Sequence, residues 1–570
     1  MTVRSRTMGF QLTILLGLLA GSAFAIVPLV TTPSWESATR QVTTGGGLWD
    51  IDTNGYLDFC MSSGLNQEQD YNTINRNFEG ELEIVPSWFG WEAGNFGHLY
   101  LGDVNNDSLM DMAVAYFGPN GERKARVYLN QGAGFGGLAS WKSRDTVSSF
   151  DCCLGDVNND GFLDLAISAG NPYNGSTRQP RIYFNRNGTL DSVPGWQSST
   201  RTSSTAVRLA DLNHDGKLDL IINSRGRLYI YLQRGDTLVR SPSWTDTTGN
   251  NIMGRRLAIG DYDNDGWLDV VAVCCGQSGS PNGVRIYHNN NGTLAKPPAY
   301  ILQRNRQRSS CAAWADVNND GFLDLAVGGL GEPVTVYENH NGILDTIPAW
   351  SWQPETVALL QTQTLAWGDL RNEHLRAVAE TASGDGSRKL FYLRHMPIQG
   401  FQSVEVNLSL IPRREYCFDP LTGYVSFHTA PSSGTGNIVF RYTYSTNPDL
   451  CLTSSEGADY NRVFYNTASA SANEALIRPG PVLPRIAARP AQFRGTTTLN
   501  AVVPPHTQGT IRVYAASGAL VGVAAEHLGP GAHTVPWPLD AGSSLTSGVY
   551  FAKLACSNGS TSGCRITKLD

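Results

Sequence analysis

The sequence lacks the short motifs that mark common catalytic centres. It contains no Gly-x-Ser-x-Gly turn, no His-Glu-x-x-His motif and no phosphate-binding loop. Its ten histidines are scattered, and its ten cysteines never show the Cys-x-x-Cys spacing of a zinc site. These absences favour a binding or display protein over an enzyme. They leave open a polysaccharide lyase that would use surface Arg, Tyr or Lys residues.

Long apolar runs are also missing beyond the first 25 residues. Residues 8–20 are apolar, but a membrane span needs about 20 such residues. Arg4 and Arg6 precede this run, and Ala23-Phe24-Ala25 follows it as a small-x-small cleavage site. We therefore predict a signal peptide at residues 1–25, with a retained anchor as the alternative. The mature chain should be secreted or at the cell surface, without a membrane span.

Charged residues are sparse, at 16% of the chain, with a formal net charge of −7. No nucleic acid or other strong polyelectrolyte is therefore indicated as a partner. Export would allow the cysteines to form disulfides. Cys556 could pair with Cys564 across an Asn-Gly turn, and Cys417 could pair with Cys451. Buried free thiols are the alternative.

Glycine and aromatic residues are abundant, with 60 glycines and 10% aromatics, which is typical of turns and strands. Each repeat has an acidic loop, an apolar strand, a second strand such as Arg181-Ile-Tyr-Phe-Asn185, an Asn-Gly turn and a Pro-x-aromatic element. Four short strands per repeat indicate a β-propeller. The loops recur every 50 to 55 residues and begin at Asp50, Asp103, Asp156, Asp211, Asp261, Asp316 and Asp369.

The predicted fold is all-β: a seven-bladed, or alternatively eight-bladed, β-propeller with calcium-binding hairpin loops, followed by a small C-terminal β-sandwich. The propeller is placed at 26–400 and a β-rich segment, an extra blade or a small β-domain, at 401–470. A Pro/Arg linker follows at 471–492 and the sandwich at 493–570. Pro33-Ser34-Trp35 is an extra copy of the outer element. It should complete the last blade, because an open sheet edge invites aggregation.

The six intact loops offer oxygen side chains at positions 1, 3, 5 and 9. Calcium takes about six to eight hard oxygen ligands, so a carbonyl and water would complete its shell. Sulfur and imidazole are absent from these positions, which argues against zinc or copper. Position 12 is never Glu, so a hairpin site is expected and not an EF-hand. We predict about six structural Ca²⁺ ions. The predicted ligands are Asp50, Asp52, Asn54, Asp58, Asp103, Asn105, Asp107, Asp111, Asp156, Asn158, Asp160, Asp164, Asp211, Asn213, Asp215, Asp219, Asp261, Asp263, Asp265, Asp269, Asp316, Asn318, Asp320 and Asp324.

Two loops depart from this pattern. The seventh has Arg371 at position 3 and Ala377 at position 9, so it is predicted to be empty. The second has Ser108 where the others have glycine, and it is expected to bind calcium more weakly.

These loops resemble the FG-GAP, or VCBS, repeats of integrin α-subunit propellers, certain fungal lectins and many exported bacterial proteins. The resemblance covers about residues 45–395 and implies structural calcium at the six intact loops. The fold carries adhesion, glycan binding and occasionally lyase chemistry, so it does not decide the function.

The C-terminal segments Ile511-Arg-Val-Tyr514, His533-Thr-Val-Pro-Trp537 and Ser547-Gly-Val-Tyr-Phe551 carry a second resemblance. They look like the immunoglobulin-like tail shared by flagellar-hook cap proteins and type IX secretion sorting domains. This implies contact with a secretion machinery, and a plain stalk domain is the alternative.

The sequence therefore predicts a glycan- or protein-binding adhesion module at the cell surface. A structural envelope scaffold and, less favoured, a polysaccharide lyase on a propeller face are the alternatives. Trp88, Trp196 and Trp350, one per repeat, could be sugar platforms, but regular placement is better explained by packing between neighbouring sheets.

Overall fold

The computed structural model describes residues 27–468 and 485–568, except for short gaps. These lie at 39, 65–68, 119–122, 133, 172–174, 236, 247–252, 276–282, 303–307, 356–359, 456–459, 490–491, 494–496, 504–506, 518, 530, 539–545 and 558–560. The predicted signal peptide lies outside the described residues. Within them the chain forms strands, turns and one short 3₁₀ helix at Arg413–Glu415, with no α-helix. Accordingly, the described part of the chain contains no helix that could cross a membrane.

Six antiparallel four-stranded sheets follow one another along the chain, one for each intact loop. The first is β2 (Thr43–Trp49), β3 (Asp58–Ser63), β4 (Thr73–Asn75) and β7 (Trp88–Phe89); the second is β8 (Phe96–Gly102), β9 (Asp111–Tyr116), β10 (Arg126–Tyr128) and β11 (Trp141–Lys142). The third is β12 (Cys152–Gly155), β13 (Asp164–Ile167), β16 (Arg181–Tyr183) and β19 (Trp196–Gln197); the fourth is β20 (Ser204–Ala210), β21 (Asp219–Ser224), β22 (Arg227–Tyr231) and β25 (Trp244–Asp246). The fifth is β26 (Met253–Gly260), β27 (Asp269–Cys275), β28 (Gly283–Tyr287) and β31 (Tyr300–Leu302); the sixth is β32 (Ser309–Ala315), β33 (Asp324–Gly329), β34 (Val334–Tyr337) and β37 (Trp350–Trp352).

A seventh sheet of this kind joins the two ends of the array. It consists of β38 (Thr362–Gly368), β46 (Asp449–Ser454), β47 (Arg462–Phe464) and β1 (Trp35–Glu36). No single sheet closes on itself. The sheets form a ring because the first strand of each sheet lies beside the first strand of the next, in the order β2, β8, β12, β20, β26, β32, β38, and β38 lies beside β2. This is propeller geometry, in which neighbouring sheets pack face to face.

The predicted closing strand is confirmed. Trp35 in β1 pairs with Val463 in β47, and Glu36 pairs with Arg462, so the N-terminal segment forms the outer edge of the last sheet. The Trp35 ring is 7% exposed and lies edge-on to Phe59 of the first sheet, with ring centroids 6.4 Å apart. The N-terminal strand thus ties the last sheet to the first.

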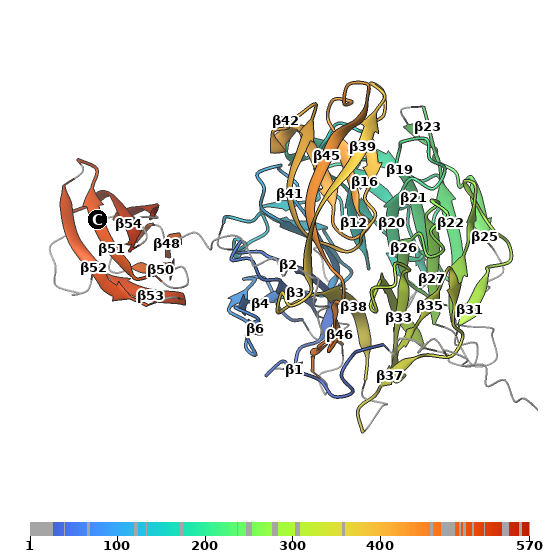
Figure 1. Ribbon diagram of the computed structural model, residues 1–570, viewed down its shortest axis with the longest axis horizontal. Coiled ribbons are helices and arrows are strands. Elements are labelled where there is room, and N and C mark those ends of the chain that lie inside the picture. Colours follow the sequence, from blue (N-terminus) through green and yellow to red (C-terminus); the bar gives the residue numbers. More distant parts are fainter. Residues whose placement is uncertain are drawn as a thin grey trace, which may run out of the picture.

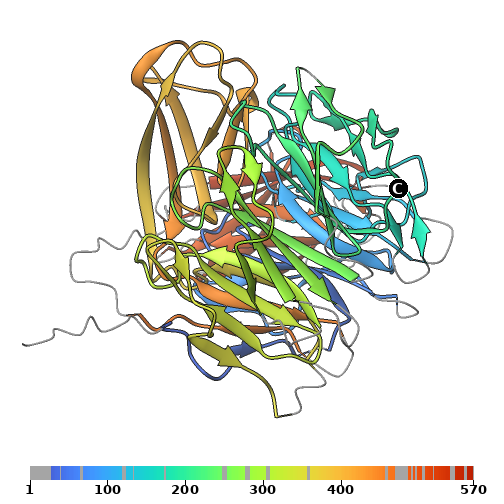
Figure 2. The ribbon, with the colours of Figure 1, turned by 90° about the vertical axis from the view of Figure 1, so that its right-hand side faces the viewer.

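The boundary predicted at residue 400 is wrong, because the last sheet is interrupted by an insertion. Between β38 and β46 the chain forms a separate β-structure, which we call the inserted module (residues 375–445). One of its sheets is β39 (Leu375–Gly384), β45 (Gly434–Ser445), β41 (Ile398–Val406) and β42 (Ser409–Leu410); the other is β40 (Leu390–Tyr392), β44 (Tyr424–Phe427) and β43 (Tyr416–Asp419). None of the module's strands belongs to the ring of first strands from β2 to β38. Figures 1 and 2 show the module, in orange and gold, projecting beyond the propeller sheets.

The repeated tryptophans pack between sheets, as the sequence predicts. The indole of Trp88 donates to the carbonyl of Phe135 (2.8 Å) and lies edge-on to Tyr128, both beyond its own sheet. Trp196 donates to Leu238 of the next repeat in the same way (2.9 Å). These rings are 4% and 5% exposed, so they cannot serve as sugar platforms.

A short hairpin follows the third strand in five of the repeats. These are β5–β6 (Asn77–Phe78, Glu81–Leu82), β17–β18 (Asn185–Arg186, Thr189–Leu190), β23–β24 (Gln233–Arg234, Thr237–Leu238), β29–β30 (Asn289–Asn290, Thr293–Leu294) and β35–β36 (Asn339–His340, Ile343–Leu344). A sixth pair, β14–β15 (Gly170–Asn171, Ser176–Thr177), lies within the third repeat. The Asn-Gly tips have positive φ, as tight hairpins require: Asn187 has 52° and Gly188 has 88°.

The C-terminal residues form two further sheets around their own apolar core. One is β48 (Arg485–Arg489), β50 (Thr497–Val503) and β53 (Gly531–Trp537); the other is β49 (Gln492–Phe493), β55 (Thr561–Lys568), β54 (Gly548–Cys556), β51 (Gly509–Ala515) and β52 (Leu520–Leu528). Leu499, Ile511 and Leu554 are fully buried between them. This C-terminal unit begins at β48, because residues 485–489 pair with β50. The linker predicted at 471–492 is therefore too long at its C-terminal end.

The suggested disulfide between Cys417 and Cys451 is not formed, and the side chain of Cys564, the suggested partner of Cys556, lies outside the described part of the structure. Cys417 lies in the inserted module and Cys451 in the last propeller sheet, and both are buried free thiols. Cys556 is also a free thiol, buried in the C-terminal sandwich.

Candidate metal loops and ligand cleft

The acidic loops connect the first and second strands of their sheets and share one hydrogen-bond pattern. We number them loop one (50–58), loop two (103–111), loop three (156–164), loop four (211–219), loop five (261–269) and loop six (316–324). In loop three the Asp156 carboxylate accepts the N–H groups of Asp160 and Gly161, both at 2.9 Å. Asn159 and Gly161 have φ of 55° and 83°, a reversal that favours Asn and Gly. Positions 1, 3, 5 and 6 therefore wrap around one centre.

The aspartate at position 9 lies at the start of the second strand and is completely buried in all six loops. Asp164 accepts the N–H groups of Val157 (3.0 Å) and Asn185 (2.7 Å). Burial raises the pKa of the equivalent Asp111, Asp219 and Asp269 to about 8. A buried carboxylate with such a pKa is ionised at neutral pH only if a cation joins it.

The geometry of the loops fits a divalent cation. In loop one, oxygens of Asp50, Asp52 and Asp58 all lie within 4.8 Å of one another. In loop five the same holds for Asp261, Asp263 and Asp265. Hard carboxylate and amide oxygens at this spacing suit calcium, which would neutralise the buried charge. The residues at positions 1, 3, 5 and 9 would hold the ion.

In six of the seven propeller sheets a buried asparagine just after the third strand holds the loops together, and sequence reasoning missed its role. The side-chain N–H₂ of Asn185 donates to Leu163 of its own loop (3.0 Å) and to Val104 of loop two (2.8 Å). Asn77 links loop one to Leu370 of the last sheet (2.8 Å). The signal in the sequence was the Asn that recurs after the third strand in every repeat except the fourth, which has Gln233. The same two bonds are made by Asn77, Asn130, Asn185, Asn289, Asn339 and Asn466.

We expect Asn185→Ala to destabilise the propeller by about 2 kcal/mol or more, because two buried carbonyls lose their donor. Urea unfolding followed by tryptophan fluorescence measures the loss. Gln233 is the matched control, since it holds the same position in the fourth repeat and its backbone N–H makes the matching bond to Asp219, but its side chain makes no bond to a loop carbonyl among the described residues. Gln233→Ala should cost clearly less. Equal losses at the two positions would contradict the bridging role.

The seventh loop keeps the hydrogen-bond pattern of the others, but its position 3 is the cationic Arg371. Asp369 accepts the N–H groups of Glu373 (3.2 Å) and His374 (2.6 Å). The guanidinium of Arg371 pairs with Glu373 at 2.7 Å. Position 9 is not lost, as the sequence suggested, because Asp449 supplies it after the insertion by accepting the N–H of Leu370 (2.9 Å).

The inserted module is fastened onto loops two, three and four. Arg413 pairs with Asp103 of loop two at 2.8 Å, and the Ser426 hydroxyl donates to Asp156 of loop three at 2.6 Å. The backbone N–H of Asp211 in loop four donates to the Tyr392 hydroxyl at 2.9 Å. The module therefore contacts predicted ligands directly. In loop two, Arg413 and the positive φ of Ser108 (77°) both weigh against tight ion binding.

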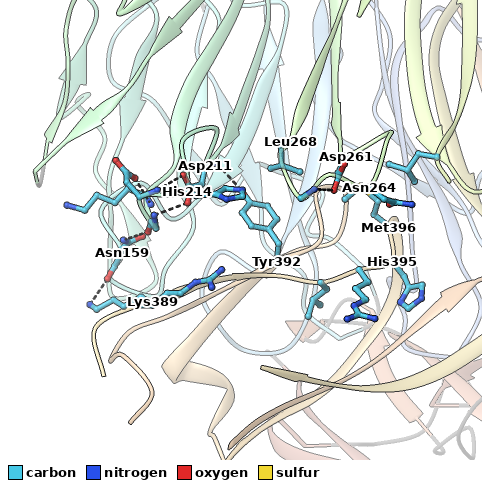
Figure 3. A pocket seen from close by; sticks show the side chains of 18 of the residues that line it. Asn159, Asp211, His214, Asp261, Asn264, Leu268, Lys389, Tyr392, His395 and Met396 are labelled. Carbon is cyan, nitrogen blue, oxygen red and sulfur yellow. Dashed lines mark hydrogen bonds between the residues drawn. The ribbon is translucent and has the colours of Figure 1, made fainter. Parts of the chain in front are cut away.

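A cleft of about 1190 Å³ lies between the module and loops three to six. One wall carries Asp211, His214, Asp261 and Asn264 from the loops, and the other carries basic and aromatic side chains of the module (Figure 3). The module side chains that line it are Arg388, Lys389, Tyr392, Arg394, His395 and Tyr444.

The module wall holds its polar groups in fixed positions. Lys389 donates to the carbonyl of Asn159 at 2.8 Å, which bridges one end of the cleft (Figure 3). His395 stacks on Tyr444 with ring centroids 3.8 Å apart. Arg388 and Arg394 are exposed, and neither is in an ion pair among the residues that the structure describes. The Nε of Arg388 donates to the carbonyl of Leu390 at 2.6 Å, and its guanidinium carbon lies 4.7 Å from the centroid of the Phe391 ring. Two cations are thus available to a ligand.

A second charge cluster lies buried near the ring centre and is structural. Asp151 contacts Arg208 (2.9 Å), His98 (3.1 Å) and Arg256 (3.5 Å). Burial, with Arg256 nearby, lowers the pKa of His98 to about 4, so the imidazole is neutral. Sequence reasoning missed this cluster because its members come from different repeats.

Comparison with known proteins agrees with the repeat structure. Residues 103–167, 168–222, 213–272 and 261–327 match the FG-GAP-like repeat. Human integrin alpha-11 (Homo sapiens) is 25% identical over 176 residues, covering 27% of this chain and 15% of that protein. Chicken integrin alpha-6 (Gallus gallus) is 29% identical over 154 residues, covering 23% of this chain and 14% of that protein. The chain thus aligns with only a small part of the length of these integrin relatives.

Among solved structures, the Dos1 propeller is similar with a TM-score of 0.37 and 11% identity, covering 73% of this chain and 95% of that chain. The Cps50 (Swd1) β-propeller domain of Myceliophteria thermophila has a TM-score of 0.38 and 10% identity, covering 69% and 98%.

Proposed function

We propose that this chain is an exported β-propeller, loaded with divalent ions, that binds an extracellular glycan in the cleft between its loops and the inserted module. The observation that carries the proposal is the module wall of the cleft, whose volume is about 1190 Å³. Exposed guanidinium groups and stacked rings on this wall face the oxygen-rich loops on the other wall. Sugars are recognised by this combination of aromatic faces and polar groups. The exposed guanidinium groups of Arg388 and Arg394 favour a glycan with carboxylate groups.

Calcium is the ion that we propose for the loops, at up to six sites, with a structural role. The support is the oxygen-only ligand set of loops two, three and four and the buried carboxylates at position 9. Loop seven is proposed to be empty because Arg371 occupies its position 3.

Catalysis is not part of this proposal. The loop carboxylates are engaged with backbone N–H groups, which suits metal binding better than proton transfer. A lyase acting on uronate polymers and a purely structural envelope scaffold are the alternatives, and both are outcomes of the binding test.

We further propose that the chain is secreted or held at the cell surface. The N-terminal pattern of residues 1–25 supports export. The two-sheet C-terminal structure suits an immunoglobulin-like tail that engages a secretion machinery.

The test is a glycan array, followed by calorimetry with the best acidic oligosaccharide. Arg388→Ala and Arg394→Ala should each weaken binding at least about tenfold, because each removes a charge-assisted hydrogen bond. Arg414→Ala is the matched control: Arg414 is also on the module, 78% exposed, and pairs with Glu415 outside the cleft.

The control should bind like the unchanged protein. Binding that survives loss of both cleft arginines would place the ligand elsewhere. Cleavage of a uronate polymer would support the lyase instead, and no glycan bound at all would leave the scaffold role.

A further inference from the structure

In loops one, five and seven, the side chain just before the buried asparagine faces position 3 of its own loop. In loop one, Arg76 lies 3.9 Å from Asp52. In the seventh loop, the ring of Tyr465 lies against Arg371, 4.2 Å from the guanidinium carbon to the ring centroid. In loop five this position is His288, whose imidazole Nδ1 lies 3.2 Å from Asp263. A nitrogen donor therefore enters one loop that the sequence pattern had assigned to oxygen alone.

His288 approaches the ligand set of loop five from the side of the third strand. Its Nδ1 lies 3.4 Å from Asp269, and its Nε2 lies 3.9 Å from Asp265. Ligand atoms of Asp263, Asp269 and His288 all lie within 4.8 Å of one another. Loop five thus holds two overlapping groups, Asp263 with Asp269 and His288, and Asp263 with Asp261 and Asp265.

These distances fit one shared ion. Two ligand atoms bound at about 2.1 Å from a zinc-like ion are separated by about 3.0 to 3.4 Å, which is the spacing between Nδ1 and the two carboxylate oxygens. The Tyr262 ring lies edge-on to the imidazole at 6.3 Å and holds its plane. On the other side, hairpin β35–β36 packs against Asp263: a Cβ at Gly342 would lie 2.8 Å from that of Asp263.

We infer that loop five is a mixed nitrogen and oxygen site that prefers a transition-metal dication such as Zn²⁺ or Co²⁺ over Ca²⁺. Imidazole is a poor ligand for calcium and a good one for these ions. Loops two, three and four have Leu129, Phe184 and Leu232 at the position of His288, so they keep an oxygen-only set. The inference rests on the proposed metal loading of the loops and adds a second kind of ion to it.

The experiment uses the full mature protein, stripped of metal and reloaded with excess calcium. Cobalt(II) chloride is then added, and the visible absorption of nitrogen-ligated Co²⁺ is followed. Bound cobalt and calcium are counted by elemental analysis after gel filtration. The inference predicts about one cobalt ion per chain, which zinc displaces while calcium stays on the other loops.

His288→Asn should weaken cobalt binding at least about tenfold, because it removes the only nitrogen donor at this centre among the described residues. Calcium content and the melting curve should not change. Two control variants keep His288. His214→Asn changes an exposed loop-four histidine that stacks on Trp267. His340→Asn changes a histidine whose ligand atom lies within 4.8 Å of those of Glu338 and Asp345.

Both control variants should bind cobalt normally. Retention of tight cobalt binding by His288→Asn would overturn the inference, because His288 would then contact the aspartates without binding the metal. Loss of cobalt in His340→Asn alone would overturn it in favour of the β35–β36 hairpin. If the protein binds calcium but no cobalt, only this inference is overturned. If it binds neither metal, the proposed metal loading of the loops is overturned as well.

Discussion

Deletion of residues 27–40 should prevent the chain from folding into soluble protein. The deletion removes β1, the outer strand of the last sheet, together with the buried side chains of Val27, Leu29 and Trp35. Removing one buried aromatic side chain costs about 3 to 5 kcal/mol, and the two aliphatic side chains add to this. The total approaches the whole stability of a typical domain. It also bares the edge of β47 to pairing with other chains.

Expression yield, gel filtration and a thermal melt measure this effect. Trp35→Phe is the matched control, because it keeps β1 and most of the buried ring but loses the indole bond to the carbonyl of Leu82 (3.0 Å). This variant should fold with a loss of about 1 to 2 kcal/mol. A soluble deletion variant with a cooperative melt would show that the ring does not need its N-terminal strand.

Removal of divalent ions should lower the melting temperature by more than about 10 °C at neutral pH. Each site filled at about 100 times its dissociation constant adds about 2.7 kcal/mol of stability, so a few sites suffice for a shift of this size. Without ions, the position-9 carboxylates remain buried beside other carboxylates, as for Asp164 beside Asp156. Differential scanning calorimetry with and without chelator gives the shift, and added calcium should reverse it.

The metal-free protein should also lose stability as the pH rises. Burial raises the pKa of Asp111, Asp219 and Asp269 to about 8 in the folded state, whereas an unfolded aspartate has a pKa of about 3.9. Between these values the folded chain binds more protons than the unfolded chain, so its stability falls from about pH 4 to about pH 8. Melting temperatures of dialysed protein across this range test the sign. A metal-free protein that is most stable at pH 8 would contradict the burial of these groups.

The repeat and the ring closure could be predicted from sequence because both are local patterns. Each intact loop carries its ligands within nine residues, and Pro33-Ser34-Trp35 copies the outer element of a repeat. The packing of the repeated tryptophans follows from the same pattern, because one of them recurs at the same place in each repeat. Trp88 and Trp196 therefore lie where regular spacing placed them, between neighbouring sheets.

The inserted module could not be predicted in this way. Asp449 completes the loop that begins at Asp369, but 79 residues separate them, so no contiguous motif remains. The module's contacts with loops two to four, such as Ser426 with Asp156, depend on tertiary packing alone. The cleft and its arginines exist only because of that docking. His288 likewise lies outside the nine residues of loop five, just after the third strand of the same sheet.

Elemental analysis of the purified mature protein, after gel filtration in metal-free buffer, tests the central claim most directly. Six intact loops with converging oxygens predict several tightly held divalent ions per chain, mostly calcium. Substituting Asp164 by Ala should remove about one of them, and the matching change at Asp449, which completes the seventh loop, should remove none. A folded protein that carries no divalent ion would contradict the account.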